Sequence, residues 1–422
     1  MSNKIKVVWI CSFSNAEVRA YYKTKINPIL RKLLKFRGHS TGEGVDSARW
    51  NTNAIHEFEK TGDVELHIIT PIRYLAKKEV RFRLNGINYY FFREENSGLI
   101  AQLKYQFLTK NSSLFHKNRK IIKSIIREVK PDIVHVIGAE NPYYSLAALD
   151  IPKEIPTIVQ LQALLHRAAD TTKNLIEEKS FRYKGALEEE ILKRADYIGT
   201  EAHAFRNHIL NNIDSHAQFL DISIMMANKV DFETGPKMYD FVYFAAGINK
   251  AGEVAIESFG LAFQQNPALT LLVVGGYDMD FKNELDQIIE KYSIGKAVTF
   301  TGRLPTYDDV IAAIRTARFA ILPIKIDLVP GVIWESICNG LPVITSITDN
   351  GTTNLNIKRE SVMLVEQGDF HTMANNMVRL TEDPEYAEKL RQNALVTYYE
   401  WFDDYGMMQK WVNAYKLIAS KN

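Results

Sequence analysis

The sequence predicts an α/β protein made of two doubly wound domains, each a mostly parallel sheet covered by helices on both faces. Short apolar strands alternate with helical periodicity along almost the whole chain, which is typical of parallel sheets. The chain has 422 residues, more than one typical hydrophobic core holds. Its composition, 46% hydrophobic and 24% charged, is that of an ordinary globular protein. We therefore expect two domains of comparable size.

In the first half, buried strands are expected where short apolar runs are bounded by turn-forming residues. The runs are KVVWIC at 6–11, VELHII at 64–69, IVHVI at 133–137 and TIVQL at 157–161. A hairpin is expected between VRFRL and INYYFF, because Asn85 and Gly86 tolerate the positive φ angles of a two-residue turn.

The second half repeats the strand rhythm, with helices expected at 250–265 and 306–316. Its strands are expected at 241–246, 269–275, 297–301, 319–323 and 342–345. The domains are expected to join near residues 231–240. In doubly wound sheets, ligands bind at the carboxyl ends of strands, so we expect a site there and in the cleft between the domains.

Cysteine and histidine usage excludes several classes of site. Cys11 and Cys338 lie in unrelated segments, which fits a reducing compartment and argues against a disulfide framework or a cysteine zinc site. The ten histidines form no HExxH or comparable motif, so no metal site is predicted. No apolar run approaches a membrane span and no signal-peptide pattern opens the chain. We expect a cytoplasmic protein.

The net charge of +2 hides an asymmetry along the chain. Residues 1–150 carry 25 Lys and Arg against 14 Asp and Glu, and the remainder carries 27 against 36. The basic residues gather with apolar ones at 21–39 and 104–130. Such segments favour peripheral contact with an anionic membrane surface, or they are plain solvated helix faces. Nucleic acid is not expected as a partner, because the overall charge is near neutral and no nucleic-acid module is present.

The segment ILPIKIDLVPGVIWESICNGLPVITS, residues 321–346, predicts an anion site. A strand ends near Pro323, Pro330 suits the first turn of a helix, and Gly340 suits its end. The helix start offers unpaired N–H groups and a positive dipole end to phosphate. Asp327 is expected in the loop and Glu335 about a turn and a half inside the helix, on either side of one ligand. The alternative is an ordinary strand, turn and helix with incidental acids.

Within this segment, DLVPGVIWESICNGLPVI resembles the donor-site motif of glycosyltransferases of the GT-B fold, specifically the retaining family 4, also called glycosyl transferases group 1. The resemblance implies that Asp327 contacts sugar hydroxyls and that Glu335 holds the ribose. It also implies that the backbone at Pro330, Gly331 and Val332 meets the diphosphate.

Two further segments carry the resemblance through the second half. KAGEVAIESF resembles the family's KGxxxLIxAF, which implies that Lys250 neutralises donor phosphates. The arginine that usually precedes this lysine is absent, because Phe244 and Ala245 stand in its place. In AVTFTGRLPTYDDV, which resembles the family's nucleobase-binding loop, Gly302 and Arg303 are implied donor contacts.

In the first half the resemblance continues more thinly. PDIVHVIGAENP resembles the strand and acceptor-side loop of the family, which makes Glu140 a candidate sugar contact. Gln162 stands where many members have histidine. Gly42 and Gly44 are the nearest equivalent of the family's glycine pair after the first strand.

The resemblance implies two Rossmann-like domains, 1–235 on the acceptor side and 236–400 on the donor side, with a C-terminal helix at 401–422 that packs back toward the first domain. It implies metal-independent, retaining transfer of a sugar from a nucleoside diphosphate sugar. The expected acceptor is a hydroxyl of a saccharide or lipid-linked saccharide, in cell-surface polysaccharide synthesis.

Two alternatives to sugar transfer remain open. A nucleotide-sugar epimerase shares the architecture and needs ionisable groups facing the sugar, for which His39, Glu140 and His166 are candidates. A non-catalytic nucleotide-sugar-binding protein is the other alternative, because the phosphate-binding arginine is absent and Gln162 replaces histidine.

Overall fold

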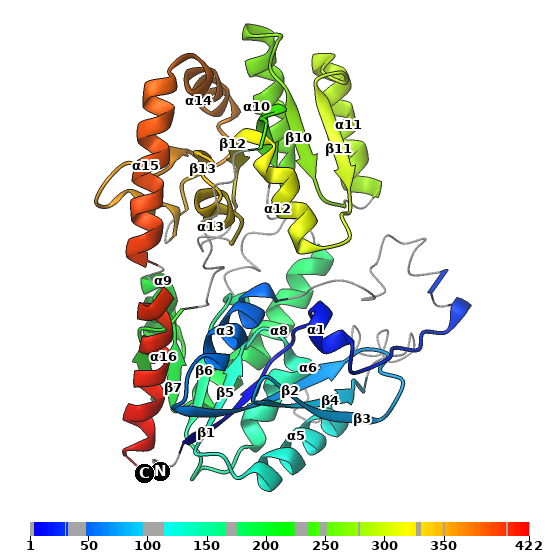
Figure 1. Ribbon diagram of the computed structural model, residues 1–422, viewed down its shortest axis with the longest axis vertical. Coiled ribbons are helices and arrows are strands. Elements are labelled where there is room, and N and C mark those ends of the chain that lie inside the picture. The colour runs from blue at the N-terminus through cyan, green and yellow to red at the C-terminus, as the bar shows by residue number, and fades with distance from the viewer. Residues whose placement is uncertain are drawn as a thin grey trace. The chain divides into compact units, whose positions relative to one another are not determined.

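The computed structural model describes residues 4–29, 31–32, 48–95, 114–165, 175–223, 235–244, 251–276, 279–325, 331–348, 351–401 and 404–421. Described residues up to 223 and from 404 onward form one compact unit, and those from 235 to 401 form a second. Each unit is an α/β domain with its own sheet (Figure 1). The predicted domain limits at 235 and 400 stay predictions. No helix in the described part of the chain is both long and apolar enough to cross a membrane.

The first unit contains an eight-stranded sheet in the order β3-β4-β2-β1-β5-β6-β7-β8. Its strands are β1 (Ile5–Ile10), β2 (Val64–Ile72), β3 (Glu79–Leu84), β4 (Ile87–Arg93), β5 (Ile133–Ile137), β6 (Thr157–Gln160), β7 (Tyr197–Gly199) and β8 (Gln218–Leu220). Its helices are α1 (Ala16–Arg19), α3 (Arg49–Glu59), α5 (His116–Val129), α6 (Pro142–Ser145), η1 (Leu146–Asp150), α8 (Leu175–Arg194), α9 (His203–Asn212) and α16 (Asp404–Ala419). All pairings are parallel except that of β3 with β4.

The strand order of the first sheet reverses between β1 and β5. The chain moves outward from β1 to β2 on one side, and β5, β6, β7 and β8 then follow on the other. The loops that leave β1 and β5 therefore diverge at the carboxyl edge, where open α/β sheets bind ligands. Glu140 follows β5 by three residues and lies in one of these two loops.

The β3–β4 hairpin has the turn that its sequence predicts. Asn85 and Gly86 have φ angles of 49° and 84°, and two successive positive values are the signature of the tight turn that matches strand twist. β3 pairs antiparallel with β4, and β4 pairs parallel with β2. The hairpin thus adds two strands to the sheet, and β3 is the edge strand on that side.

Helix α16 completes the first unit from the far end of the chain. It contacts α3, β1 and β5 (Figure 1). Trp9 Nε1 donates to the Tyr415 hydroxyl at 2.9 Å, and that hydroxyl lies 2.7 Å from His135 Nδ1. Because the phenol oxygen already accepts from Trp9, its own proton goes to Nδ1. The prediction that a C-terminal helix packs on the first domain is confirmed.

The second unit contains a six-stranded parallel sheet in the order β11-β10-β9-β12-β13-β14. Its strands are β9 (Tyr239–Tyr243), β10 (Leu271–Val274), β11 (Val298–Gly302), β12 (Ala317–Leu322), β13 (Val343–Ser346) and β14 (Met363–Val365). Its helices are α10 (Gly252–Gln265), α11 (Met279–Tyr292), α12 (Tyr307–Arg315), α13 (Gly331–Cys338), η3 (Thr352–Asn356), α14 (Phe370–Glu382) and α15 (Pro384–Trp401). Helices α10, α11 and α14 share one apolar cluster with the sheet, while α13 packs with α15.

The second sheet reverses its order between β9 and β12. The loops that leave these two strands carry the residues that the sequence analysis assigned to the donor: Lys250 follows β9, and Asp327 follows β12. The two strands pair with each other, so their carboxyl ends are neighbours at the second unit's switch point.

Gly340 ends α13 as predicted. Its φ is 74°, the left-handed conformation that glycine adopts without strain. Its N–H bonds to the carbonyl of Ile337, and the N–H of Leu341 bonds to that of Ser336. This pair of bonds is a Schellman cap, which satisfies the last carbonyls of the helix.

The predicted fold, two doubly wound domains, is confirmed. The strands missed by the sequence analysis within the described residues are β7, β8 and β14, each of three residues. Runs this short carry no measurable alternation and gain their pairing only from the neighbouring strand.

Candidate active site

Several predicted site residues lie outside the described residues: Gly42, Gly44, Lys250, Asp327 and Pro330. Their assigned roles stay predictions. Those that the structure describes are Gly302, Arg303, Gly331, Val332 and Glu335 in the second unit, and Glu140 and Gln162 in the first. The two sets lie in different compact units of the chain.

Helix α13 begins at Gly331 and places Glu335 in its second turn. Val332 lies in the first turn, where its carbonyl accepts from the Ser336 hydroxyl at 2.9 Å. Glu335 is partly exposed, whereas Trp334 and Ser336 beside it are buried. A carboxylate in the second turn of a helix can bind hydroxyls while phosphate binds the unpaired N–H groups at the helix N-terminus.

Tyr307 is a partner of Glu335 that the sequence analysis missed. Its hydroxyl donates to Glu335 Oε1 at 2.9 Å. Tyr307 is the first residue of α12 and lies 28 residues before Glu335. The side chains meet because α12 and α13 flank the same strand, β12, a proximity that sequence spacing does not reveal.

Gly302 and Arg303 lie at the carboxyl end of β11. Gly302 has a φ of 65°, so a residue with a Cβ is strained there. Arg303 is exposed and has no hydrogen bond or ion pair to the described residues. A Cβ on Gly276, at the end of the neighbouring β10, would lie 3.0 Å from the Arg303 Cβ. The glycine therefore lets the two loops approach closely.

Lys325 supplies a cation just after β12, the strand that pairs with β9, and the family arginine is missing just after β9. It follows β12 by three residues, and its Nζ forms an ion pair with Glu253 Oε1. Glu253 lies in the first turn of α10, the helix that follows Lys250. This ion pair thus joins the segment after β12 to the start of α10. A lysine two residues after Pro323 was the signal that the sequence analysis passed over.

In the first unit, Glu140 and Gln162 meet at the carboxyl edge of the sheet. With the Gln162 amide oriented to satisfy both neighbours, its Nε2 donates to Glu140 Oε1 at 3.0 Å and its Oε1 accepts from Trp50 Nε1 at 2.8 Å. Asn141 Nδ2 donates to the same Glu140 oxygen at 2.7 Å. The chain of bonds joins the start of α3 to the ends of β5 and β6, which gives the loops a fixed arrangement.

The pKa of the Glu140 carboxyl lies close to neutral pH. Burial raises the pKa of Glu140 to about 7, against a smaller lowering by its own backbone N–H and by the Lys184 ammonium. Its Oε2 atom is enclosed and has no hydrogen-bond partner among the described residues. Burial likewise raises the pKa of Glu188 well above its ordinary value, although Glu188 accepts from the Leu165 N–H at 2.9 Å. The first unit therefore carries two acids whose protonated forms are favoured by burial.

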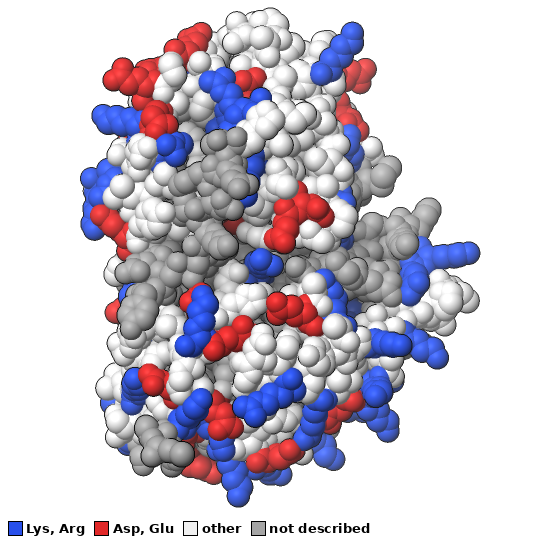
Figure 2. All heavy atoms as spheres, viewed as in Figure 1, with Lys and Arg blue, Asp and Glu red and all other residues white. Residues whose placement is uncertain are grey.

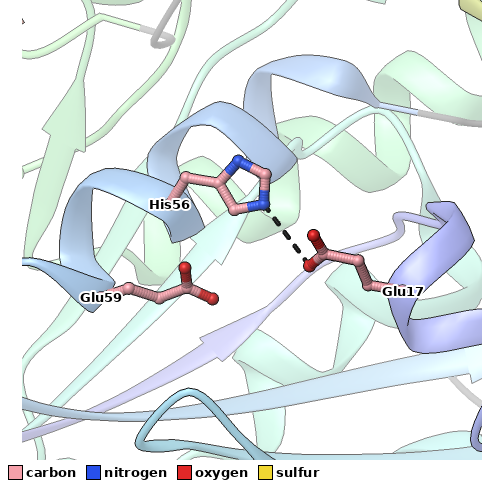
Figure 3. A group of neighbouring side chains, drawn as sticks. All are labelled: Glu17, His56 and Glu59. Atoms are coloured by element: carbon pink, nitrogen blue, oxygen red, sulfur yellow. Dashed lines mark ion pairs between the residues drawn. The ribbon is translucent and has the colours of Figure 1, made fainter.

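A group of metal-ligand side chains lies elsewhere on the first unit. Figure 3 shows Glu17 of α1 pointing toward His56 and Glu59 of α3. One ligand atom from each lies within 4.8 Å of the others, and His56 Nε2 is 3.6 Å from Glu17 Oε2. Imidazole and carboxylate suit a borderline divalent cation. Glu59 lies nine residues along α3 from Trp50, or roughly 14 Å, so this group is separate from Glu140. The predicted metal independence of the reaction stays a prediction.

Comparison with known proteins agrees with this architecture. Residues 234–396 match the family described as glycosyl transferases group 1. The chain is similar to sucrose-phosphate synthase from Thermosynechococcus elongatus, with 15% identity, a TM-score of 0.69, and coverage of 99% of this chain and 100% of that one. It is similar to HepE from Anabaena in complex with UDP and glucose, with 13% identity, a TM-score of 0.64, and coverage of 97% and 99%. It is also similar to a glycosyltransferase from Rickettsia africae, with 15% identity, a TM-score of 0.64 and full coverage of both chains. No curated protein sequence matches the chain.

The fold and the matched domain define the class. The chain has the GT-B fold, and its second unit is a glycosyl transferases group 1 domain. By class it is a glycosyltransferase. The predicted resemblance is thereby confirmed, whereas the donor, the acceptor and the stereochemistry belong to the proposal that follows.

Proposed function

We propose that the protein is a retaining glycosyltransferase that moves a sugar from a nucleoside diphosphate sugar to a hydroxyl of a saccharide or lipid-linked saccharide. The observation that carries the proposal is the second unit's switch point. There the paired strands β9 and β12 end side by side in a group 1 domain, and α13, which carries Glu335, is the next helix after β12. UDP is the first nucleotide to test, because HepE and the pneumococcal transferase GtfA, both similar in structure, have been crystallised with it.

The chemical difficulty in this reaction is departure of the diphosphate while positive charge builds on the sugar ring. The α13 start can stabilise the leaving group with N–H groups and its dipole. Lys250 adds a cation, and Lys325 stands in for the absent arginine once phosphate displaces Glu253 from its ion pair. Asp327 and Glu335 orient the sugar and the ribose. The transfer needs no metal in this scheme, and a chelator such as EDTA is expected to leave the rate unchanged.

The acceptor side of the proposal rests on the first unit. A carboxyl with a pKa of about 7 is protonated in about half of the molecules at pH 7. In that form it can both donate to and accept from sugar hydroxyls, which an ionised acid cannot. Glu140 meets this description, and its loop lies at the switch point between β1 and β5. Gln162 is held beside it by Trp50. These groups fit an uncharged saccharide.

The cellular setting proposed is the cytoplasmic face of a membrane, in cell-surface polysaccharide synthesis. On the face drawn in Figure 2, basic side chains lie over the first unit with acidic ones between them. Helix α5 contributes Lys117, Lys120 and Lys123. Sedimentation with vesicles tests this setting: equal binding to neutral and anionic vesicles contradicts the membrane contact.

Calorimetry of the whole protein with UDP, GDP and ADP sugars tests the function itself. Micromolar to low-millimolar binding of one donor, followed by release of its nucleotide on addition of saccharide acceptors, supports sugar transfer. Binding of none of them contradicts it.

An epimerase is the second candidate, favoured by one observation: Glu140 is an ionisable group with a pKa near neutrality. Incubation of the bound donor without acceptor separates the two candidates. An epimerised nucleotide sugar supports the epimerase, and an unchanged sugar supports transfer.

A further inference from the structure

Helix α12 begins with a strongly fixed turn that presents Tyr307. Thr306 caps the helix: its hydroxyl accepts from the Asp309 N–H, and the Asp309 carboxylate accepts from the Thr306 N–H. This reciprocal pair is a capping box, with aspartate in the place of the more usual glutamate. Tyr307 directly follows the cap, so the first turn fixes its backbone.

Helix α12 is joined to α13 at both ends of α12, and both connections reach Glu335. At the start of α12, the Tyr307 hydroxyl donates to Glu335 Oε1 at 2.9 Å. At its end, Arg315 Nε donates to Asn339 Oδ1 at 2.7 Å, and Asn339 Nδ2 donates to the backbone carbonyl of Glu335 at 2.7 Å. The two connections lie roughly 12 Å apart along α12. One fixes the carboxylate of Glu335 and the other fixes its backbone.

We propose that Tyr307 is a positioning residue that holds Glu335 for the ribose hydroxyls and so makes the donor site selective for ribonucleotides. The inference rests on the proposed function, in which Glu335 holds the ribose. A carboxylate has about four lone-pair positions. A phenol bound to one oxygen fixes the plane of the group, so that its acceptor positions point in set directions, which suits two adjacent hydroxyls better than a freely rotating carboxylate does.

The size of the effect follows from what hydrogen bonds between a hydroxyl and a charged group contribute. Such a bond contributes about 1.5–3 kcal/mol, and a tenfold change in affinity corresponds to about 1.4 kcal/mol. Removal of one ribose hydroxyl from the nucleotide should therefore weaken binding about tenfold or more. A misdirected carboxylate keeps its charge but loses most of this directional gain.

The alternative is that Tyr307 merely packs between two helices. The second unit offers a matched control, because Tyr292 in α11 donates to Glu257 Oε1 in α10 at 2.7 Å. That pair is also a tyrosine–carboxylate bond between two helices, and Lys291 Nζ donates to the same Glu257 oxygen. It lies at the end of α11, which is opposite to the carboxyl edge of the sheet. Tyr292→Phe therefore removes an equivalent bond without touching the donor site.

The test is calorimetric binding of UDP, 2′-deoxy-UDP and 3′-deoxy-UDP to the wild type, Tyr307→Phe and Tyr292→Phe. We expect the wild type to bind UDP about tenfold more tightly than either deoxy form. In Tyr307→Phe, UDP binding should weaken about tenfold and the preference over the deoxy forms should shrink to about threefold or less. Tyr292→Phe should match the wild type in all three titrations. A Tyr307→Phe protein that retains the full preference overturns the inference.

A second background keeps the inference testable if Tyr307→Phe also changes stability. If Tyr307 acts only through the carboxylate, Tyr307→Phe in a Glu335→Gln protein should change UDP binding less than twofold. A tenfold loss in that background contradicts the inference. If UDP does not bind, the series is run with GDP or ADP and their deoxy forms. A wild type that binds none of the three overturns the proposed function, and the inference with it.

Discussion

The two sheets treat ionisable side chains at their carboxyl edges in opposite ways. In the first unit, burial favours the protonated form of the acids: it raises the pKa of Glu140 to about 7 and raises that of Glu188 well above its ordinary value. In the second unit the charged groups are paired: Lys325 with Glu253, and Glu335 with the Tyr307 hydroxyl. A neutral edge suits uncharged hydroxyls, whereas a charged edge suits an anionic diphosphate.

The contrast continues below the edges. In the first unit, His135 is wholly buried in β5 against α16, and burial lowers its pKa to about 3. In the second unit, burial raises the pKa of Glu257. The Lys291 ammonium and the Tyr292 hydroxyl together lower it by more, so the pKa of Glu257 lies below its ordinary value. We therefore expect the stability of the first unit to depend on pH. Nucleotide binding by the second unit should depend on its charged side chains and on salt.

The largest expected effect comes from Glu335→Ala, which breaks the charged edge. Loss of the ribose contact and of its Tyr307 partner should reduce release of nucleotide from the bound donor about 10²–10³-fold, by analogy with the loss of one preorganised polar group. Glu360→Ala is the matched control, because Glu360 also accepts from a tyrosine hydroxyl, that of Tyr386. Equal rates for the two variants would refute the assignment of Glu335 to the donor.

The sequence predicted the parts of this site that depend on local chain chemistry. A helix was expected between Pro330 and Gly340, and α13 spans Gly331–Cys338. Gly340 acts as the cap that its sequence predicts. What escaped prediction depends on contacts between distant segments. Tyr307 meets Glu335 across 28 residues, and Lys325 meets Glu253 across 72.

The raised pKa of Glu140 escaped prediction for a different reason. Its residue type and loop were visible in the sequence, and so was its place after a strand. Its ionisation, however, depends on how completely β5, β6 and their loops enclose the carboxyl, and desolvation is a property of the folded chain alone. The same holds for His135, which reads as an ordinary strand residue until α16 covers it.

The next effect in size is acid destabilisation of the first unit through His135. An unfolded imidazole takes up a proton below its ordinary pKa of 6.5, but the buried one stays neutral down to about pH 3. Stability should therefore fall with falling pH across this window, by up to about 1.4 kcal/mol per pH unit. Urea unfolding between pH 7 and pH 4.5 measures the slope. His135→Gln should flatten it, and His216→Gln, at an exposed position, should not.

Glu140→Gln tests the edge of the first unit, where stability should change with pH in the direction opposite to that predicted for His135. The folded pKa of Glu140, about 7, lies above its ordinary value of 4.5, so its stabilising contribution is present below pH 4.5 and is lost as pH rises through 7. The variant should gain about 1–2 kcal/mol relative to the wild type between pH 5 and pH 8, within the linkage limit of about 1.4 kcal/mol per pH unit. Nucleotide binding should not change. A pH-independent difference between the two proteins would show that Glu140 is ionised throughout.

The smallest expected effect, and the one that sharpens the comparison most, is that of Lys325→Ala. If Lys325 replaces the absent arginine, its removal should weaken UDP binding by about 1 kcal/mol, or roughly fivefold, and should lower the salt dependence of that binding. Lys282→Ala is the control, because Lys282 also forms an ion pair with an acid in the same unit, Asp286, but within α11.

Equal UDP affinity in the Lys325→Ala and wild-type proteins would contradict the role of Lys325 and leave Lys250 as the cation that binds the phosphates. If Lys325→Ala weakens UDP binding at low salt but not in 0.5 M salt, the lysine lies against the diphosphate, because screening at that concentration acts over about 4 Å.

Glu253→Gln tests whether Lys325 must leave its ion pair with Glu253 before it meets the diphosphate. Removal of the Glu253 charge should strengthen UDP binding, since the lysine no longer has to exchange one anion for another.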